Sequence, residues 1–269
     1  MHYYFARLLS VGFLPIRQAG WVLVILQLHF AVPCISQDFS HKEAHAHNDY
    51  DHPHPLFDAL KNGFTSVETD IHLRRGILVV AHNHAGSRSP RLEKLYLRPL
   101  DSLQCLGHLP AGFFLMIDIK TDAEETYRVL KSESKKYPAL LCSSQSCPVK
   151  IFLSGNRPMK LIMKEGYQGI GIDGRPVDLG NGFTVEMMPV VSDHYKNWSS
   201  WNGRTTPSEK DLIRIVELAK RVHAEGKKLR LWAIPDNELA WEALLNTGVD
   251  FINTDHLKEL NEFLKKKGH

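Results

Sequence analysis

Cysteine is scarce in this chain, with four residues among 269. None of the four has the spacing of a structural zinc site, so their pattern disfavours a zinc-stabilised fold. Cys142 and Cys147 are close enough in sequence to close a small disulfide loop. Cys105 stands in an apolar context, which predicts a buried and unreactive thiol.

Strong charge of either sign is also lacking. Lysine and arginine number 33 and aspartate and glutamate 30, which gives a net charge of +3 with the histidines neutral. This excess is too small to indicate a nucleic-acid partner, and we expect the basic residues to form solvated surface. A composition of 43% hydrophobic and 23% charged residues is that of an ordinary globular protein.

Long hydrophobic runs are missing. The apolar stretch over residues 21–32 is too short for the ~20 residues that span a bilayer, although a permanent anchor is the alternative. Arg7 and Arg17 precede this stretch, and small residues follow it up to Ser36. Such an order predicts a secretory signal peptide over residues 1–36 and an exported protein, periplasmic or secreted.

Repeats and low-complexity linkers are absent after residue 40, where strand-like and helix-like segments alternate. We predict eight strands, over residues 43–47, 65–71, 113–119, 150–153, 169–172, 186–191, 228–232 and 250–253. We predict helices over residues 55–62, 123–136, 158–165, 208–225, 238–247 and 256–267, and a loop with four basic side chains over 83–99. This count favours a single (β/α)8 barrel over residues 37–269. A doubly wound open sheet, the alternative, would show fewer strands.

Acidic residues stand at the ends of two of these strands. Side chains alternate along a strand, so Glu68 and Asp70 share one face, opposite the apolar residues of the same segment. The same alternation turns Asp118 to the inside of the barrel, at the end where barrel enzymes carry their active sites. Neighbouring carboxylates repel one another unless a cation neutralises them, so we predict a divalent metal ion at this point.

Histidines flank the predicted metal site. His45 and His47 share a face at the end of the first strand, and a turn at Arg75-Gly76 would return a strand that ends at His82. Histidine exchanges protons near neutral pH, so His47 and His82 on either side of a metal suggest acid–base chemistry on a phosphate ester. A hydrogen-bonded structural role for His82 is the alternative.

Three groups of motifs resemble a known superfamily. The run His47-Asn48-Asp49-Tyr50, followed by residues 55–60, resembles the altered inheritance of mitochondria proteins and their bacterial relatives. Glu68-Thr69-Asp70, His82 and residues 118–121 look like the site of sphingomyelinase D-type phospholipases. Residues 231–234 and 248–255 are similar to the last two strands of glycerophosphodiesterases. Together they resemble the superfamily of phosphatidylinositol-specific phospholipase C and glycerophosphodiester phosphodiesterase.

The resemblance implies a (β/α)8 barrel that cleaves a phosphodiester, of glycerophosphodiester or phospholipid head-group type. It implies that one Mg²⁺ or Ca²⁺ is held by Glu68, Asp70 and Asp118. It further implies that His47 and His82 form an acid–base pair. The substrate-binding residues that it implies are Lys120, Asn48, His45 and Trp232. A phospholipid substrate would involve transient contact with a membrane surface.

Several points stay open at this level. Asn48 follows His47 where glycerophosphodiesterases have an arginine, so the alcohol groups of the substrate are not fixed. Hydrolysis and formation of a cyclic phosphate are both compatible with the motifs, and either His45 or His47 could be the first catalytic histidine. One rival function is a zinc amidohydrolase-like or phosphoesterase barrel that uses His45, His47 and His194. The other is a non-catalytic exported barrel that binds a phosphorylated ligand.

Overall fold

The computed structural model of the chain describes residues 40–141 and 148–268. All of them belong to the second of two units, Ile35–His269. The predicted signal peptide and the pair Cys142 and Cys147 lie outside the described residues. Among the described helices, none has both the length and the apolar character needed to cross a membrane.

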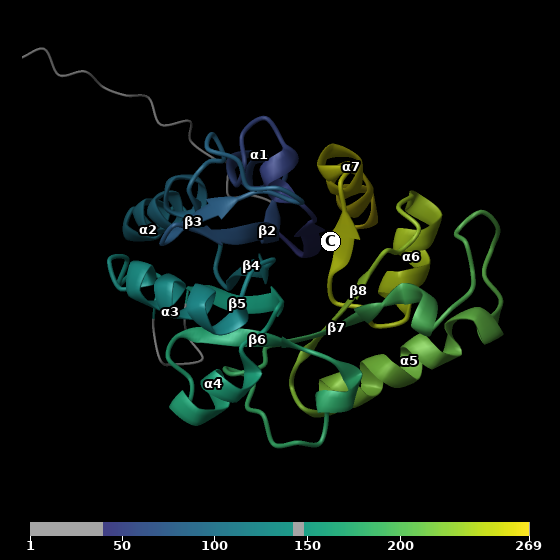
Figure 1. The fold of residues 1–269 in the computed structure, drawn as a ribbon. Helices are drawn as coiled ribbons and strands as arrows, with labels where there is room; N and C mark the ends of the chain where they lie inside the picture. The colour runs from purple at the N-terminus through teal and green to yellow at the C-terminus, as the bar shows by residue number, and fades with distance from the viewer. Residues whose placement is uncertain (1–39, 142–147, 269) are drawn as a thin grey trace, which may run out of the picture. The chain divides into compact units, whose positions relative to one another are not determined.

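Eight parallel strands form a nearly closed barrel surrounded by helices (Figure 1). Around the barrel the order is β8-β7-β6-β5-β4-β2-β1-β9, and a parallel bridge from Arg230 to Phe251 joins the two ends. The strands are β1 His41–Ala46, β2 Phe64–Arg74, β4 Phe113–Ile119, β5 Val149–Gly155, β6 Ile170–Gly174, β7 Val190–His194, β8 Lys228–Trp232 and β9 Ile252–Thr254. The predicted (β/α)8 architecture is confirmed.

Helices follow most of the strands and pack on the outside of the barrel. They are α1 Phe57–Lys61, α2 Arg98–Cys105, α3 Ala123–Ser134, α4 Met159–Glu165, α5 Glu209–Ala224, α6 Glu238–Asn246 and α7 Leu257–Lys267. Short helical turns stand at Asp49–Asp51, Glu93–Leu97, Pro176–Asp178 and Tyr195–Asn197. The starts of α3 and α6 are fixed by side-chain caps, because Asp122 accepts from the N–H of Glu125 and Asn237 from that of Ala240.

Two apolar layers hold this arrangement. The larger lies between the strands and the helices, and the smaller fills the inside of the barrel with Phe114, Met116, Phe152, Val190 and Phe251. The rings of Phe114 and Phe251 meet edge to face, with centroids 5.1 Å apart. Since Phe114 and Met116 point inward, the alternation of β4 also turns Asp118 inward, above this apolar layer. Polar side chains therefore occupy the C-terminal mouth.

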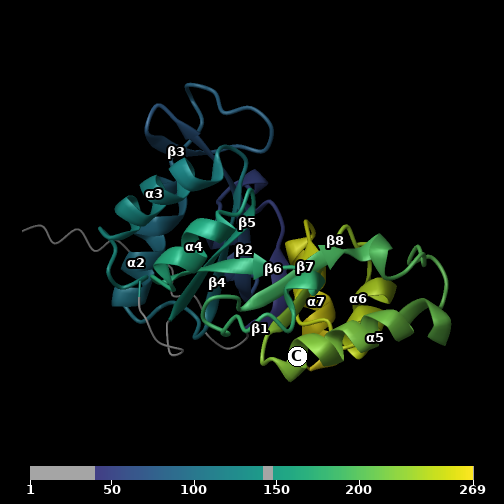
Figure 2. The ribbon, with the colours of Figure 1, turned by 60° about the horizontal axis from the view of Figure 1, so that its bottom comes forward.

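An antiparallel hairpin extends β2 beyond the barrel. Strand β3, Ile77–Val80, pairs with the end of β2 and lies against α3 (Figure 2). The turn between them is Arg75-Gly76, as predicted, and both residues are left-handed, with φ of 51° and 76°. The N–H of Ala81 donates to the carbonyl of Asp70 at 3.2 Å, which returns the chain to the barrel mouth just before His82.

The prediction of a loop over residues 83–99 is wrong for the second half of that segment, which is helical. A π-helical turn at Glu93–Leu97 leads directly into α2. Leu92, Tyr96, Leu100 and Leu103 are spaced four, four and three residues apart and are all buried, which is the period of a helix. Cys105 follows Leu103 by two residues and so points away from the core. Its thiol is exposed, and the predicted buried cysteine is also wrong.

Strand β7, the sixth strand of the barrel, begins four residues later than predicted, at Val190 instead of Glu186. The preceding segment packs irregularly against β6, where the N–H of Ile172 donates to the carbonyl of Met187 at 2.7 Å. Gly171 makes this close approach possible, because a Cβ atom there would lie 2.9 Å from the carbonyl oxygen of Glu186.

A buried carboxyl group fixes the loop after β1. One oxygen of Asp49 accepts from the N–H of Leu56 at 2.6 Å and from the hydroxyl of Tyr96 at 2.8 Å. Burial raises the pKa of Asp49 to about 7, against the opposing effect of these two hydrogen bonds. The loop that carries Asn48 and Tyr50 is thus anchored to the helical turn before α2.

We predict that Tyr96→Phe lowers the free energy of unfolding by about 1–3 kcal/mol, because it leaves the buried carboxyl of Asp49 with one donor fewer. Urea denaturation measures the change. Tyr127→Phe is the matched control, since the Tyr127 hydroxyl is equally buried but makes no hydrogen bond. That variant should be as stable as the parent or more stable, and an equal loss in both variants would contradict the argument.

Candidate active site

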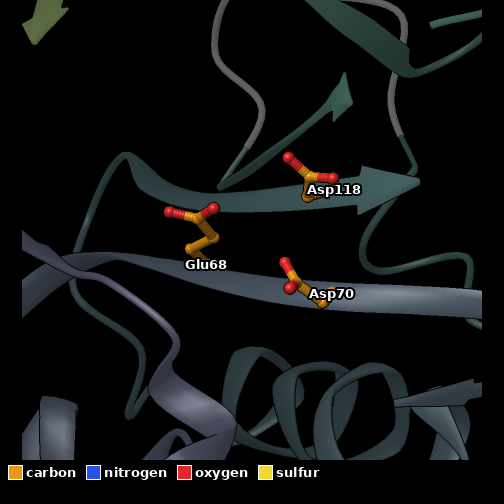
Figure 3. A group of neighbouring side chains, drawn as sticks. All are labelled: Glu68, Asp70 and Asp118. Atoms are coloured by element: carbon orange, nitrogen blue, oxygen red, sulfur yellow. The ribbon is translucent and has the colours of Figure 1, made fainter. Parts of the chain in front are cut away.

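Three carboxylates meet at the barrel mouth. Glu68 and Asp70 come from β2 and Asp118 from the neighbouring β4, as Figure 3 shows. Asp70 and Asp118 stand side by side in the strand register. One oxygen of each of the three groups lies within 4.8 Å of the others. The structure therefore brings together the three residues predicted as metal ligands.

Gly155, at the end of β5, determines how close Asp118 can lie. Its φ of 64° is left-handed, and a Cβ atom at this position would stand 2.2 Å from Oδ1 of Asp118 and 2.6 Å from the carbonyl oxygen of Ile119. Any side chain here would displace the carboxylate. No motif in the sequence marks this glycine, because its role depends on a contact with a neighbouring strand.

The positive charge of Lys120 is shared between two of the carboxylates and does not balance both. The ammonium of Lys120 lies 3.1 Å from Oδ2 of Asp70 and 3.0 Å from Oδ1 of Asp118. Burial and the charges of Glu68 and Asp70 raise the pKa of Asp118, although Lys120 acts in the opposite direction. Oδ1 of Asp70 is buried and makes no hydrogen bond. A donor set of carboxylate oxygens with one unpartnered atom fits a hard divalent cation such as Mg²⁺ or Ca²⁺.

Arg230, which the sequence analysis did not select, pairs with Glu68 inside the barrel. Its Nη2 lies 2.6 Å from Oε2 of Glu68, and its Nε donates to Asn253 at 2.8 Å. Burial, the largest single effect, would raise the pKa of Glu68, but Arg230 and His45 together outweigh burial and lower that pKa to about 2. The sequence of β8 does indicate an inward-facing arginine, because Lys228, Arg230 and Trp232 alternate with leucines.

His45 lies within the barrel wall and is completely buried. Its Nδ1 is 2.7 Å from the hydroxyl of Ser66 and its Nε2 is 3.3 Å from Oε2 of Glu68. Burial, reinforced by the charge of Arg230, lowers the pKa of His45 to about 4, so the ring is neutral at physiological pH. Its predicted contact with substrate stays a prediction, and complete burial does not favour it.

His47 stands at the end of β1 with about a third of its side chain exposed (32%). Its Nδ1 is 2.8 Å from Oδ1 of Asp255, a residue that the sequence analysis placed in a motif without a role. Burial opposes the charged ring, but the hydrogen bond to Asp255 and the charge of Glu68 together raise the pKa of His47. With Nδ1 engaged, Nε2 is the nitrogen available to a reactant.

His82 lies beside the carboxylates at the end of the hairpin. Its Nδ1 is 2.8 Å from Oδ2 of Asp70, and its side chain is half exposed. The hydroxyl of Tyr50 is within hydrogen-bond distance of Asp70, His82 and Asn48, at 2.9, 3.2 and 2.9 Å. Asn48 adopts the left-handed conformation, with a φ of 45°. Tyr50 thus links the first loop to the hairpin. Like His47, His82 is held by a carboxylate through Nδ1.

Trp232 is exposed at the end of β8, next to His194 on β7. The two rings meet edge on, with centroids 4.2 Å apart, and Nδ1 of His194 accepts from the N–H of Lys196. In the described part of the chain, the carboxylate group is the one cluster of three or more metal-ligating side chains. The histidine set required by the zinc-dependent rival is therefore not assembled there.

The fold and site together define a (β/α)8 barrel with an acidic cluster flanked by two histidine–aspartate pairs. Solved structures share this fold. A calcium-dependent phosphoinositol-specific phospholipase C from Pseudomonas has a TM-score of 0.56 at 12% identity, over 84% of this chain and 93% of that one. The calcium-dependent enzyme from Streptomyces antibioticus has a TM-score of 0.52 at 12% identity, over 84% and 98%.

Comparison of sequences identifies the proteins that this chain resembles more narrowly than the shared fold does. Residues 34–106 match the family described as the AIM6-like phosphodiesterase domain. Altered inheritance of mitochondria protein 6 from Eremothecium gossypii is 27% identical, over 81% of this chain and 68% of that protein. The protein of that name from Saccharomyces cerevisiae is 25% identical, over 86% and 73%. The resemblance to the altered inheritance of mitochondria proteins, inferred from the motifs, is confirmed.

We predict that Asp255→Asn lowers the pKa of His47, because the carboxylate that favours the protonated ring is lost. In the parent the pair contributes stability below the unfolded histidine pKa, ~6.5, and this contribution is lost as the pH rises through the raised folded pKa. An NMR titration of the imidazole signals measures the shift. Asp250→Asn is the matched control, because it removes the partner of another histidine, His223 at 2.7 Å, and should leave the titration of His47 unchanged. An unchanged His47 titration in Asp255→Asn would contradict the assignment.

Proposed function

We propose that the chain is a metal-dependent phosphodiesterase in which His47 and His82 exchange protons with the substrate. The observation that carries the proposal is the set of three carboxylates within 4.8 Å, with His82 hydrogen-bonded to one of them. The match to a phosphodiesterase domain and the fold shared with calcium-dependent phospholipases C support it. The substrate would be a glycerophosphodiester or a phospholipid.

Glu68, Asp70 and Asp118 would hold the metal ion, and their oxygen donors suit Mg²⁺ or Ca²⁺. Such an ion supplies positive charge that stabilises the negative charge developing on the phosphate. Lys120 would contribute a further positive charge to a non-bridging phosphate oxygen from its place between Asp70 and Asp118. Arg230, inside the barrel, keeps Glu68 ionised and fixes its position through their hydrogen bond.

The two histidines would act from opposite sides of the carboxylate cluster. One takes a proton from the attacking oxygen as that oxygen bonds to phosphorus, and the other gives a proton to the alkoxide as its bond to phosphorus breaks. Asp255 and Asp70 hold the two rings through Nδ1, so the proton is exchanged at Nε2. The attacking oxygen is either water or a hydroxyl of the substrate, which would give a cyclic phosphate. Between His45 and His47, the exposure of His47 favours it as the catalytic residue.

We predict that His82→Ala lowers kcat/KM toward bis(4-nitrophenyl) phosphate or a lysophospholipid by about 10²–10⁴, the usual contribution of a general acid or base. Mass spectrometry identifies the product of the lipid reaction. His84→Ala is the matched control, because His84 is exposed two residues further along the same loop and has no described contact with the site. Equal activity in the two variants would refute the assigned role of His82.

We predict that calorimetry detects one Mg²⁺ or Ca²⁺ per chain and that Asp118→Asn abolishes this binding. Turnover should stop after dialysis against EDTA and return with either ion, because the carboxylates again surround a cation. Stoichiometric zinc in the purified protein, with recovery by zinc alone, would support the amidohydrolase-like rival. Binding of a phosphorylated ligand without turnover of any diester would support the non-catalytic rival.

A further inference from the structure

A cavity of about 620 Å³ opens at the C-terminal ends of β7 and β8. Its walls are formed by the residues that follow His194 on β7 and Trp232 on β8, among them Tyr195, Trp201, Ile234 and Pro235. These side chains make the walls largely apolar. The volume lies within the ~300–1,000 Å³ that is usual for small-molecule sites. The proposed catalytic residues do not line it.

The cavity adjoins the carboxylate cluster through β8. Arg230 points inward to Glu68, and Trp232, two residues further toward the mouth, lies on the same face of the strand. His194 pairs with Trp232 in the register of β7 and β8 and packs against its ring. Each of these two rings comes directly before a segment that lines the cavity, which begins at Tyr195 after β7 and at Ala233 after β8.

A second connection runs through Asp236, the residue after Pro235. Its Oδ2 accepts from the hydroxyl of Thr254 at 2.9 Å and from the N–H of Asp255 at 3.3 Å. Asp255 in turn holds His47. The residue that directly follows the cavity wall is thus hydrogen-bonded to the segment that positions one of the two histidines.

Hydrogen bonds and close contacts hold the walls of the cavity in place. The hydroxyl of Tyr195 donates to the carbonyl of Trp201 at 3.0 Å, and the indole N–H of Trp201 donates to that of Thr205 at 2.8 Å. Gly203 has a φ of 74°, and a Cβ atom there would lie 2.5 Å from Cβ of Pro235, so the two loops are in close contact. A ligand entering such a site has little ordering cost to overcome.

We propose that this cavity binds an apolar alcohol group of the substrate, such as an alkyl chain, while the phosphate lies over the carboxylates. The inference rests on the proposed phosphodiesterase function and adds a substrate class to it. A polar cluster beside an apolar cavity fits a diester with one charged and one apolar part. Each methylene buried in the cavity should strengthen binding about fourfold.

The test compares methyl and octyl 4-nitrophenyl phosphate as substrates. In the parent protein, kcat/KM for the octyl ester should exceed that for the methyl ester by at least about tenfold. Ser200→Trp places an indole in the cavity lining and should reduce this ratio to near one. Thr206→Trp, an equal insertion at an exposed position of the same loop outside the lining, should keep the parental ratio. Equal ratios in the parent and Ser200→Trp would overturn the inference.

Binding separates this inference from the proposed function. Calorimetry with octyl phosphate and methyl phosphate needs no turnover. Tighter binding of octyl phosphate that disappears in Ser200→Trp supports the cavity, even if the parent cleaves no diester and the phosphodiesterase proposal fails. Diester cleavage that is independent of chain length, with octyl phosphate bound no more tightly than methyl phosphate, overturns the cavity and leaves the phosphodiesterase proposal standing.

Discussion

The buried ion pair between Arg230 and Glu68 is the interaction on which the arrangement of the barrel mouth depends. It spans the inside of the barrel from β8 to β2, two strands separated by 162 positions in the chain. Removing one partner of a buried pair leaves an uncompensated charge, at a cost of about 3–5 kcal/mol. Because Arg230 also bonds Asn253 on β9, the pair joins three strands across the place where the barrel is closed by a single bridge.

Charge balance explains why the polar residues above this pair suit a cation. Lys120 is shared between Asp70 and Asp118, whereas Arg230 is committed to Glu68. Two cationic side chains thus face three carboxylates. Of the nearby histidines, His45 is neutral, His47 is paired with Asp255 outside the cluster, and His82 is hydrogen-bonded to Asp70 within it. Burial raises the pKa of Asp118, and the charges of Glu68 and Asp70 add to this effect, which reflects the deficit of positive charge. An added cation would relieve it.

Most of the fold and of the candidate site could be predicted from short-range periodicity in the sequence. Alternation within a strand is sufficient to turn Glu68, Asp70 and Asp118 inward, and a two-residue turn is sufficient to return His82 to the mouth. The roles of Arg230 and Asp255 could not be predicted from the sequence, because their partners lie 162 and 208 positions away. Only the closed barrel shows what these two residues contact. The start of β7 was misplaced for a different reason. It depends on the packing of residues 186–189 over Gly171, which no pattern in the segment itself expresses.

The two histidines differ in what supports them. His47 is attached to a barrel strand, and its position follows from the closure of the barrel. His82 is carried on an appendage formed by β3 and the end of β2, and shortening this appendage beyond Ile71 would leave the pairings among the eight barrel strands intact. Evolution could therefore alter the length or sequence of that appendage while the barrel persists. If the chain works as proposed, loss of His82 as a proton-transfer group would be separable from loss of the carboxylates that would bind the cation, which offers a simple route from an enzyme to a binding protein.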